Sequence, residues 1–179
     1  MTNRIGRFTA LISFLIGTMI LIIFYFTDSS AITEFGMIFI VVAGIINAGV
    51  FVKVLIDLIN EKENRKKYFF TSGIMLLNIP IILAYFYFVM ILMNTMRVSF
   101  INETGREITN LKIIGGEPKS IEKLEIGEKQ TKWIAINSIN DLILEYEFNG
   151  EVKTEMIYSY MVVGKKIEHR IGNKIKLIE

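Results

Sequence analysis

The apolar residues of this chain are distributed differently in its two halves. Three long apolar runs lie at residues 8–26, 35–56 and 69–93, and only Lys53 interrupts them with a charge. Each run reaches the roughly 20 helical residues that cross the hydrocarbon core of a bilayer. Because lipid offers the backbone no hydrogen-bond partners, each run must pair its own amides as a helix. The pattern predicts a domain of three transmembrane helices over residues 1–96.

Beyond residue 96 the apolar positions follow the period of two that is typical of β-strands. Over residues 141–148 we expect one face in a core and the other in solvent, the core face being Leu142, Leu144, Tyr146 and Phe148. Asn149-Gly150 follows, and both residue types tolerate the positive φ of a two-residue hairpin turn. The alternation continues in the second strand with Val152, Thr154, Met156, Tyr158 and Tyr160. The segment therefore predicts a β-hairpin.

Further short strands are expected at residues 97–101, 108–114, 120–126, 129–136, 165–171 and 174–178, with glycine-containing turns between them. Turn signals every 8–12 residues or so are typical of an all-β sandwich. The fold class we expect is thus membrane α followed by all-β. Three helices precede a small immunoglobulin-like β-sandwich over residues 97–179.

Charge supports this division and excludes several classes of protein. Residues 1–96 hold 12 of the 38 charged residues, and residues 97–179 hold 13 basic and 13 acidic ones. A single water-soluble globule could not bury apolar runs of this length. The net charge of +2, without a basic block in the second half, argues against nucleic acid as a partner. The absence of cysteine excludes disulfides and thiolate metal sites.

Lysine and arginine placement predicts the orientation. The N-terminus carries Arg4 and Arg7, the first loop only acidic charge, and the second loop Arg65, Lys66 and Lys67. Positive residues favour the cytoplasmic side. We expect the N-terminus and second loop inside, and residues 97–179 outside a bacterial inner membrane. The first run is longer than the apolar region of a signal peptide, so we expect it to be retained.

A few polar and small residues interrupt the apolar spans. Lys53 and Asp57 are spaced for an i,i+4 ion pair, which we favour over an intramembrane ion site. The remaining candidates suit contacts between helices, through close approach or hydrogen bonds. They are Gly44, Asn47, Ala48 and Asn78.

The chain offers little for catalysis. Its one histidine, His169, lies between Glu168 and Arg170, and we expect it to be exposed. Glu145 and Glu147 share the solvent face of a strand, where carboxylates are common. We expect no catalytic residues, no metal site, no cofactor and no small-molecule substrate. Trp133 remains open between a core position and an exposed partner-binding position.

Four segments of the second half resemble a known type of module. They are Asn102-x-Thr104-Gly105, Ile108-x-Asn110-Leu111-x-Ile113-x-Gly115, Leu124-x-x-Gly127-Glu128 and Leu144-x-Tyr146. Together they resemble the short β-sandwich modules that follow membrane anchors in small bacterial envelope proteins. Some of those are thought to be immunity proteins against secreted toxins, and the resemblance implies a protein partner of that kind. The alternative is an accessory subunit of a larger envelope complex; a small channel or transporter, and an enzyme, rank below both.

Overall fold

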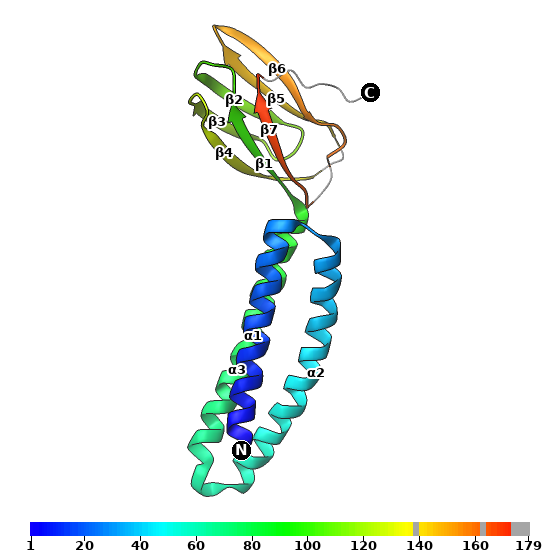
Figure 1. Ribbon diagram of the computed structural model, residues 1–179, viewed down its shortest axis with the longest axis vertical. Helices are drawn as coiled ribbons and strands as arrows, with labels where there is room; N and C mark the ends of the chain where they lie inside the picture. The colour runs from blue at the N-terminus through cyan, green and yellow to red at the C-terminus, as the bar shows by residue number, and fades with distance from the viewer. Residues whose placement is uncertain (138–139, 162–163, 173–179) are drawn as a thin grey trace. The chain divides into compact units, whose positions relative to one another are not determined.

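The computed structural model describes residues 1–137, 140–161 and 164–172. The chain divides into two compact units, Met1–Val89 and Met90–Glu179. The helices are α1 (Thr2–Thr27), α2 (Ser30–Asn60) and α3 (Arg65–Asn94), with the 3-10 turn η1 (Lys62–Asn64) before α3 (Figure 1). All three are long and apolar enough to cross a membrane. The prediction of three long apolar helices is confirmed, and each helix extends a few residues past its apolar run into polar flanks.

The three helices meet closely around Gly6 of α1. A Cβ atom at this position would lie 2.8 Å from Cγ2 of Thr71 in α3 and 3.1 Å from Cγ2 of Val54 in α2. Only a residue without a side chain leaves room at this position for the side chains of Thr71 and Val54. Next to Gly6 lies a small buried apolar cluster, formed by Ala10, Val54, Tyr68 and Met75.

Within the described residues seven strands follow α3. The first of them, β1, begins directly after Asn94, so no linker residue separates it from the helix. The seven strands are β1 (Thr95–Asn102), β2 (Ile108–Ile114), β3 (Lys119–Leu124), β4 (Lys129–Ala135), β5 (Leu142–Phe148), β6 (Glu151–Tyr158) and β7 (Lys166–Ile171). One sheet has the order β4-β1-β7, with β1 and β7 parallel, and the other has the order β3-β2-β5-β6. Helices followed by a β domain of two sheets are therefore confirmed. The strand expected at 174–178 lies outside the described residues.

Both sheets contribute side chains to one apolar core. Strand β1 presents Met96, Val98 and Phe100 to it, all without exposed surface. From the other sheet come Leu111, Ile113, Leu142 and Leu144 among others. The alternation read from the sequence of β5 thus identifies its core face correctly, because every second residue of a strand shares one face.

The turns carry the glycines that the sequence pattern assigned to them. Asn149 and Gly150 have φ values of 54° and 80°, so both adopt the left-handed conformation of the two-residue hairpin turn. Gly115, at a φ of 123°, lies where any Cβ atom would collide with the carbonyl oxygen of Asp141. The buried amide of Asn102 holds another turn. It donates to the carbonyls of Arg106 and Leu124.

Strand β6 departs from the simple expectation for a hairpin. Tyr158 of its alternating set lies opposite Leu142, beyond a register shift, and packs against the core. Val152, Thr154 and Met156 do not share that face, because the two-residue turn pairs Phe148 with Glu151 and Glu147 with Val152. Val152 and Met156 consequently lie on the outer face of the four-stranded sheet, 63% and 52% exposed. The opposite face of β6 carries Glu155 toward the interior, where it meets β7.

Candidate functional site

The two asparagines singled out in the spans both donate to α1. Nδ2 of Asn47 in α2 lies 2.7 Å from Oγ of Ser13, and Nδ2 of Asn78 in α3 lies 3.1 Å from the carbonyl oxygen of Ala10. Thr18 of α1 adds a third contact, 2.6 Å from the hydroxyl of Tyr85 in α3. Helix α1 therefore receives a polar contact from each of the other two helices.

The two small residues of α2 behave differently. Gly44 and Ala48 are exposed, and a Cβ atom at Gly44 would meet nothing within 4 Å. Within a single chain they do not contribute to packing, so a role in contact with another chain stays a prediction. Lys53 and Asp57 form the i,i+4 ion pair, with Nζ 2.6 Å from Oδ1 and the lysine side chain largely exposed.

Trp133 in β4 is neither fully buried nor free on the surface. Its neighbour Ile134 faces the core, so Trp133 lies on the outer face of the three-stranded sheet. Directly across the ladder is Arg97 of β1, whose guanidinium carbon lies 5.8 Å from the centre of the indole ring. Arg97 is itself only 2% exposed. The indole thus stacks on a buried arginine of its own chain, and its role toward a partner stays a prediction.

The expectation for His169 is wrong, because the residue is buried, with 5% of its surface exposed. In β7 its charged neighbours Glu168 and Arg170 point outward, and a strand turns every second side chain to the opposite face. Nε2 of His169 lies 2.9 Å from Oε2 of Glu155 in β6, and the imidazole packs edge-on against Phe100. The hydroxyl of Tyr146 in β5 donates to Oε1 of the same carboxylate at 2.6 Å.

This buried cluster, Tyr146–Glu155–His169, joins the two sheets through one carboxylate. Burial raises the pKa of Glu155, but the hydrogen bonds from His169, Tyr146 and the N–H of Gly172 outweigh burial, so the pKa lies below its usual value. Burial, together with the bond to Glu155, raises the pKa of the Tyr146 hydroxyl. Groups with perturbed pKa values mark functional sites in many proteins, but structural networks shift them as well.

In this cluster the Tyr146 hydroxyl and Nε2 of His169 both bind the carboxylate of Glu155. The carboxylate accepts three hydrogen bonds, and the tyrosine keeps its proton. The arrangement suits a structural link between strands. Among the described residues no group of three or more histidine and acidic side chains is placed to hold a metal ion.

The outer face of the four-stranded sheet carries a second feature, an apolar row across three strands. Ile114 of β2 pairs with Ile143 of β5, and Ile143 pairs with Met156 of β6. Ile114 is 47% exposed. Val152 lies on the same face of β6, four residues before Met156 and separated from it by Thr154. We call these four residues the outer apolar row: Ile114, Ile143, Val152 and Met156. Charged residues of the same face flank it, with Lys112 3.8 Å from Glu145.

Strand β6 is also the end strand of its sheet, so its outer edge has no neighbouring strand among the described residues. Unpaired edges with exposed apolar side chains are surfaces on which other chains add a strand. Sequence reasoning assigned Val152 and Met156 to a continuing alternation and missed their exposure. The hairpin register, fixed by the two-residue turn, was the signal that could have revealed it.

Comparison with known proteins adds little to this geometry. No protein-family model matches the chain, and no curated protein is similar to it. A protein from Eubacterium rectale, solved by NMR, is similar over 43% of this chain and 78% of its own, at 15% identity and a TM-score of 0.36. A likeness at that level carries no argument about function.

Proposed function

We propose that the chain is a multi-pass protein of a bacterial inner membrane whose outer domain, a small immunoglobulin-like β-sandwich, binds another protein without catalysing a reaction. The observation that carries the proposal is the outer apolar row beside the open edge of β6. Apolar patches of this kind on a soluble face mark interaction sites.

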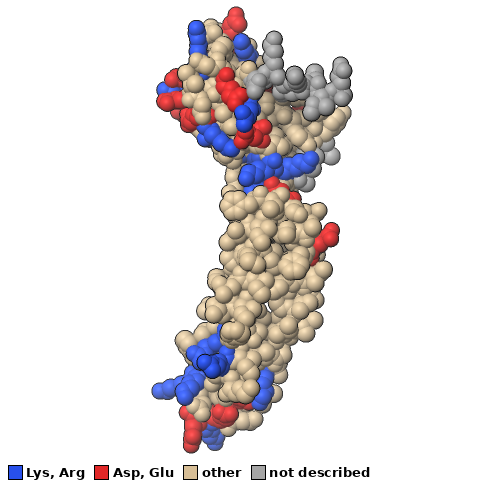
Figure 2. Space-filling view, in the orientation of Figure 1, with Lys and Arg blue, Asp and Glu red and all other residues tan. Residues whose placement is uncertain are grey.

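The proposed orientation is supported by the charges at the ends of the helices. Positive side chains gather in the loop that leads into α3, and the middle of the helices is almost without charge (Figure 2). The connection between α1 and α2 contains only Asp28 and Ser29. Under the positive-inside rule, the loop into α3 is cytoplasmic and the β domain external.

A reporter fusion tests this orientation. Alkaline phosphatase fused after Glu179 is expected to be active, and green fluorescent protein at the same position is expected to be dark. A bright fluorescent fusion would reverse the orientation and remove the outer compartment from the proposal.

The partner that fits the outer apolar row is a protein that presents an extended apolar strand. The open edge of β6 supplies backbone donors and acceptors for such a strand. Val152 and Met156 supply apolar contacts. The charged residues of this face are balanced, because Lys112 and Lys123 accompany Glu145 and Glu147. In the most specific version of the proposal, the partner is a secreted toxin and this protein confers immunity to it.

Photo-crosslinking in cells tests the surface directly. An unnatural crosslinking residue at position 152 is expected to capture one defined protein, and Met156→Ser is expected to abolish the capture. The matched control is Ile126, which is 64% exposed and lies in the turn between β3 and β4. A crosslinker there is expected to capture nothing, and Ile126→Ser should leave capture at 152 intact. Equal capture at both positions would contradict a specific site on β6.

The exposed small residues of α2 favour a second candidate, an accessory subunit of a larger envelope complex. Gly44 and Ala48 form a face that another transmembrane helix could approach closely. In that case a partner is retained by residues 1–96 alone and lost on Gly44→Leu. Under the first proposal the same partner requires residues 97–179.

A further inference from the structure

A loop of the β domain presents an aromatic ring in a conformation that the backbone rarely adopts. Tyr160 follows β6, is 72% exposed and has a φ of 53°. Left-handed φ values are uncommon outside glycine, asparagine and aspartate, and for a bulky residue they are outliers that the surrounding structure must hold in place.

Hydrogen bonds to neighbouring residues hold Tyr160 in this backbone conformation. The carboxylate of Asp141 accepts the backbone N–H of Tyr160 at 3.0 Å and the hydroxyl of Ser159 at 3.1 Å. The next residue, Met161, is buried and donates its N–H to the carbonyl of Asn140. These hydrogen bonds hold the turn that leaves the ring of Tyr160 exposed on the surface.

The same loop is joined to the point where α3 ends. The N–H of Gly164 donates to the carbonyl of Thr95 at 3.1 Å, and a Cβ atom at Gly164 would lie 3.7 Å from Cα of Met93. The N–H of Arg97 donates to the carbonyl of Lys165 at 2.8 Å. All these residues belong to the second unit, Met90–Glu179, which also contains the last turn of α3.

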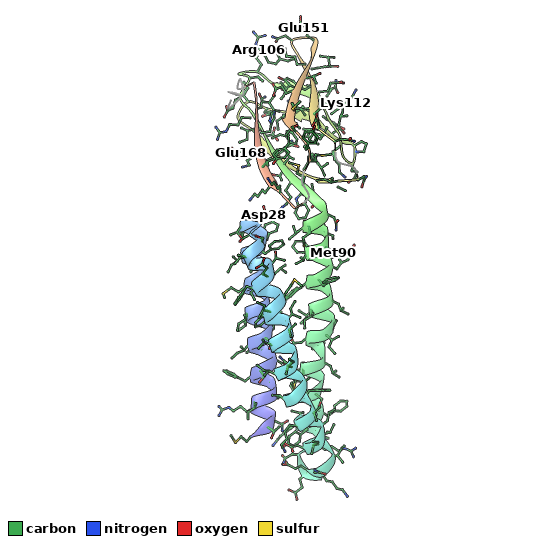
Figure 3. The ribbon with its side chains drawn as sticks, turned by 90° about the vertical axis from the view of Figure 1, so that its right-hand side faces the viewer. Asp28, Met90, Arg106, Lys112, Glu151 and Glu168 are labelled. Carbon is green, nitrogen blue, oxygen red and sulfur yellow. The ribbon has the colours of Figure 1, made fainter. Side chains whose placement is uncertain are left out.

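The side chains of the loop combine aromatic and basic chemistry. Nζ of Lys165 lies 2.9 Å from the hydroxyl of Tyr158 and 5.5 Å from the centre of its ring, and Lys166 beside it is exposed. Tyrosine is enriched where hydrocarbon meets water, and lysine is attracted to anionic headgroups. The opposite end of the domain, around Glu151, lies far from Met90 (Figure 3).

We propose that four residues at the junction of β6 and β7, namely Tyr158, Tyr160, Lys165 and Lys166, form a lipid-contacting surface that rests in the headgroup layer of an anionic bilayer. The inference rests on the proposed membrane span of α3, because the span brings its last turn to the bilayer surface. Contact of the loop with lipid fixes the height and tilt of the domain, and so determines which part of the outer sheet a partner can reach.

Spin labels test this in the full chain, which contains no cysteine of its own. Single variants Tyr160→Cys, Glu151→Cys and Leu83→Cys are labelled and reconstituted into nanodiscs of mixed phosphatidylcholine and phosphatidylglycerol. Collisions with oxygen, which concentrates in lipid, are compared with collisions with a water-soluble nickel chelate. Leu83, exposed on α3, reports the span, and Glu151 reports the far end of the domain.

The expected result is a loss of nickel collisions and a gain of oxygen collisions at position 160 relative to position 151. Changing Lys165 and Lys166 together to Glu should return position 160 to the values of water. The matched change of Lys112 and Lys153 to Glu should not.

The outcomes distinguish the proposed membrane span of α3 from the proposed lipid-contacting surface. If the Leu83 label is not in lipid, the proposed span fails. If it is in lipid while position 160 reads bulk water, the lipid-contacting surface alone is overturned. Protection of position 160 from both reagents would indicate a protein contact there and would also overturn it.

Discussion

Replacing Glu155 with leucine removes the one acceptor shared by two buried side chains. Tyr146 and His169 are 3% and 5% exposed, and both direct a polar atom at the Glu155 carboxylate. After the change, neither polar atom keeps a hydrogen bond to another described residue, and burial limits access to water. A buried polar group left unsatisfied costs about 1–3 kcal/mol. Two such groups give an expected loss of roughly 2–5 kcal/mol in the free energy of unfolding of the β domain.

Removing one of the donors should cost less free energy than removing the shared acceptor. In His169→Phe the carboxylate keeps the hydroxyl of Tyr146 and the N–H of Gly172, and its side chain is 23% exposed, so water can reach it. We expect a loss of about 1–2 kcal/mol, the loss of one partly compensated hydrogen bond. Glu151→Leu, on the exposed end of the same strand, is the control and should stay within about 0.5 kcal/mol of the parent.

The assay is urea unfolding of the full chain in detergent micelles, followed by tryptophan fluorescence. Trp133 is the only tryptophan and lies in β4, so the signal reports the β domain alone. An unchanged midpoint for Glu155→Leu would refute the description of the cluster as a structural link. A larger loss for His169→Phe than for Glu155→Leu would refute the asymmetry between shared acceptor and single donor.

Three further predictions concern the helices, the hairpin and acid. Gly6→Leu places a side chain against Thr71 and should lower the thermal stability of the helices by about 1–3 kcal/mol on circular dichroism, whereas Gly44→Leu should not; equal stabilities would contradict the close approach. Gly150→Val, at a φ of 80°, should destabilise the β domain by about 1–3 kcal/mol, and an unchanged urea midpoint would count against the turn. The pKa of Glu155 is lowered in the folded state from its ordinary 4.5, so its contribution is complete above that pH and is lost as the pH falls through the lower folded value. The stability difference between the parent and Glu155→Gln should therefore shrink below about pH 4.5, and a difference independent of pH would contradict the shift.

The elements of this fold are largely predictable from sequence because their signals are local. An apolar run of transmembrane length has one backbone solution, and the Asn149-Gly150 turn with alternating flanks defines a hairpin. The strand bounds from 95 to 171 differ from the expectation by a few residues at most.

The burial of the residues in the candidate site was harder to predict, since it depends on strands that are distant in sequence. His169 was expected on the surface because of its charged neighbours, yet the period of two through Ile167, His169 and Ile171 indicates a core face. In β6 two sequence signals conflict. Apolar alternation favours Val152 in the core, whereas the turn register places it opposite Glu147, and register prevails because backbone pairing fixes every side chain of the strand at once.

The buried cluster and the proposed lipid-contacting loop are parts of one arrangement. Glu155 lies five residues before Tyr160, and His169 lies four residues after Lys165, so their hydrogen bond closes the base of the loop between β6 and β7. A slip of β7 by two residues along β1 would keep its apolar residues on the core face but would move His169 away from Glu155. A carboxylate that must meet one imidazole and one phenol allows a single register. That register also sets where Gly164 and Lys165 join the end of α3. The polar cluster inside the domain therefore fixes the position of the aromatic and basic side chains at its edge.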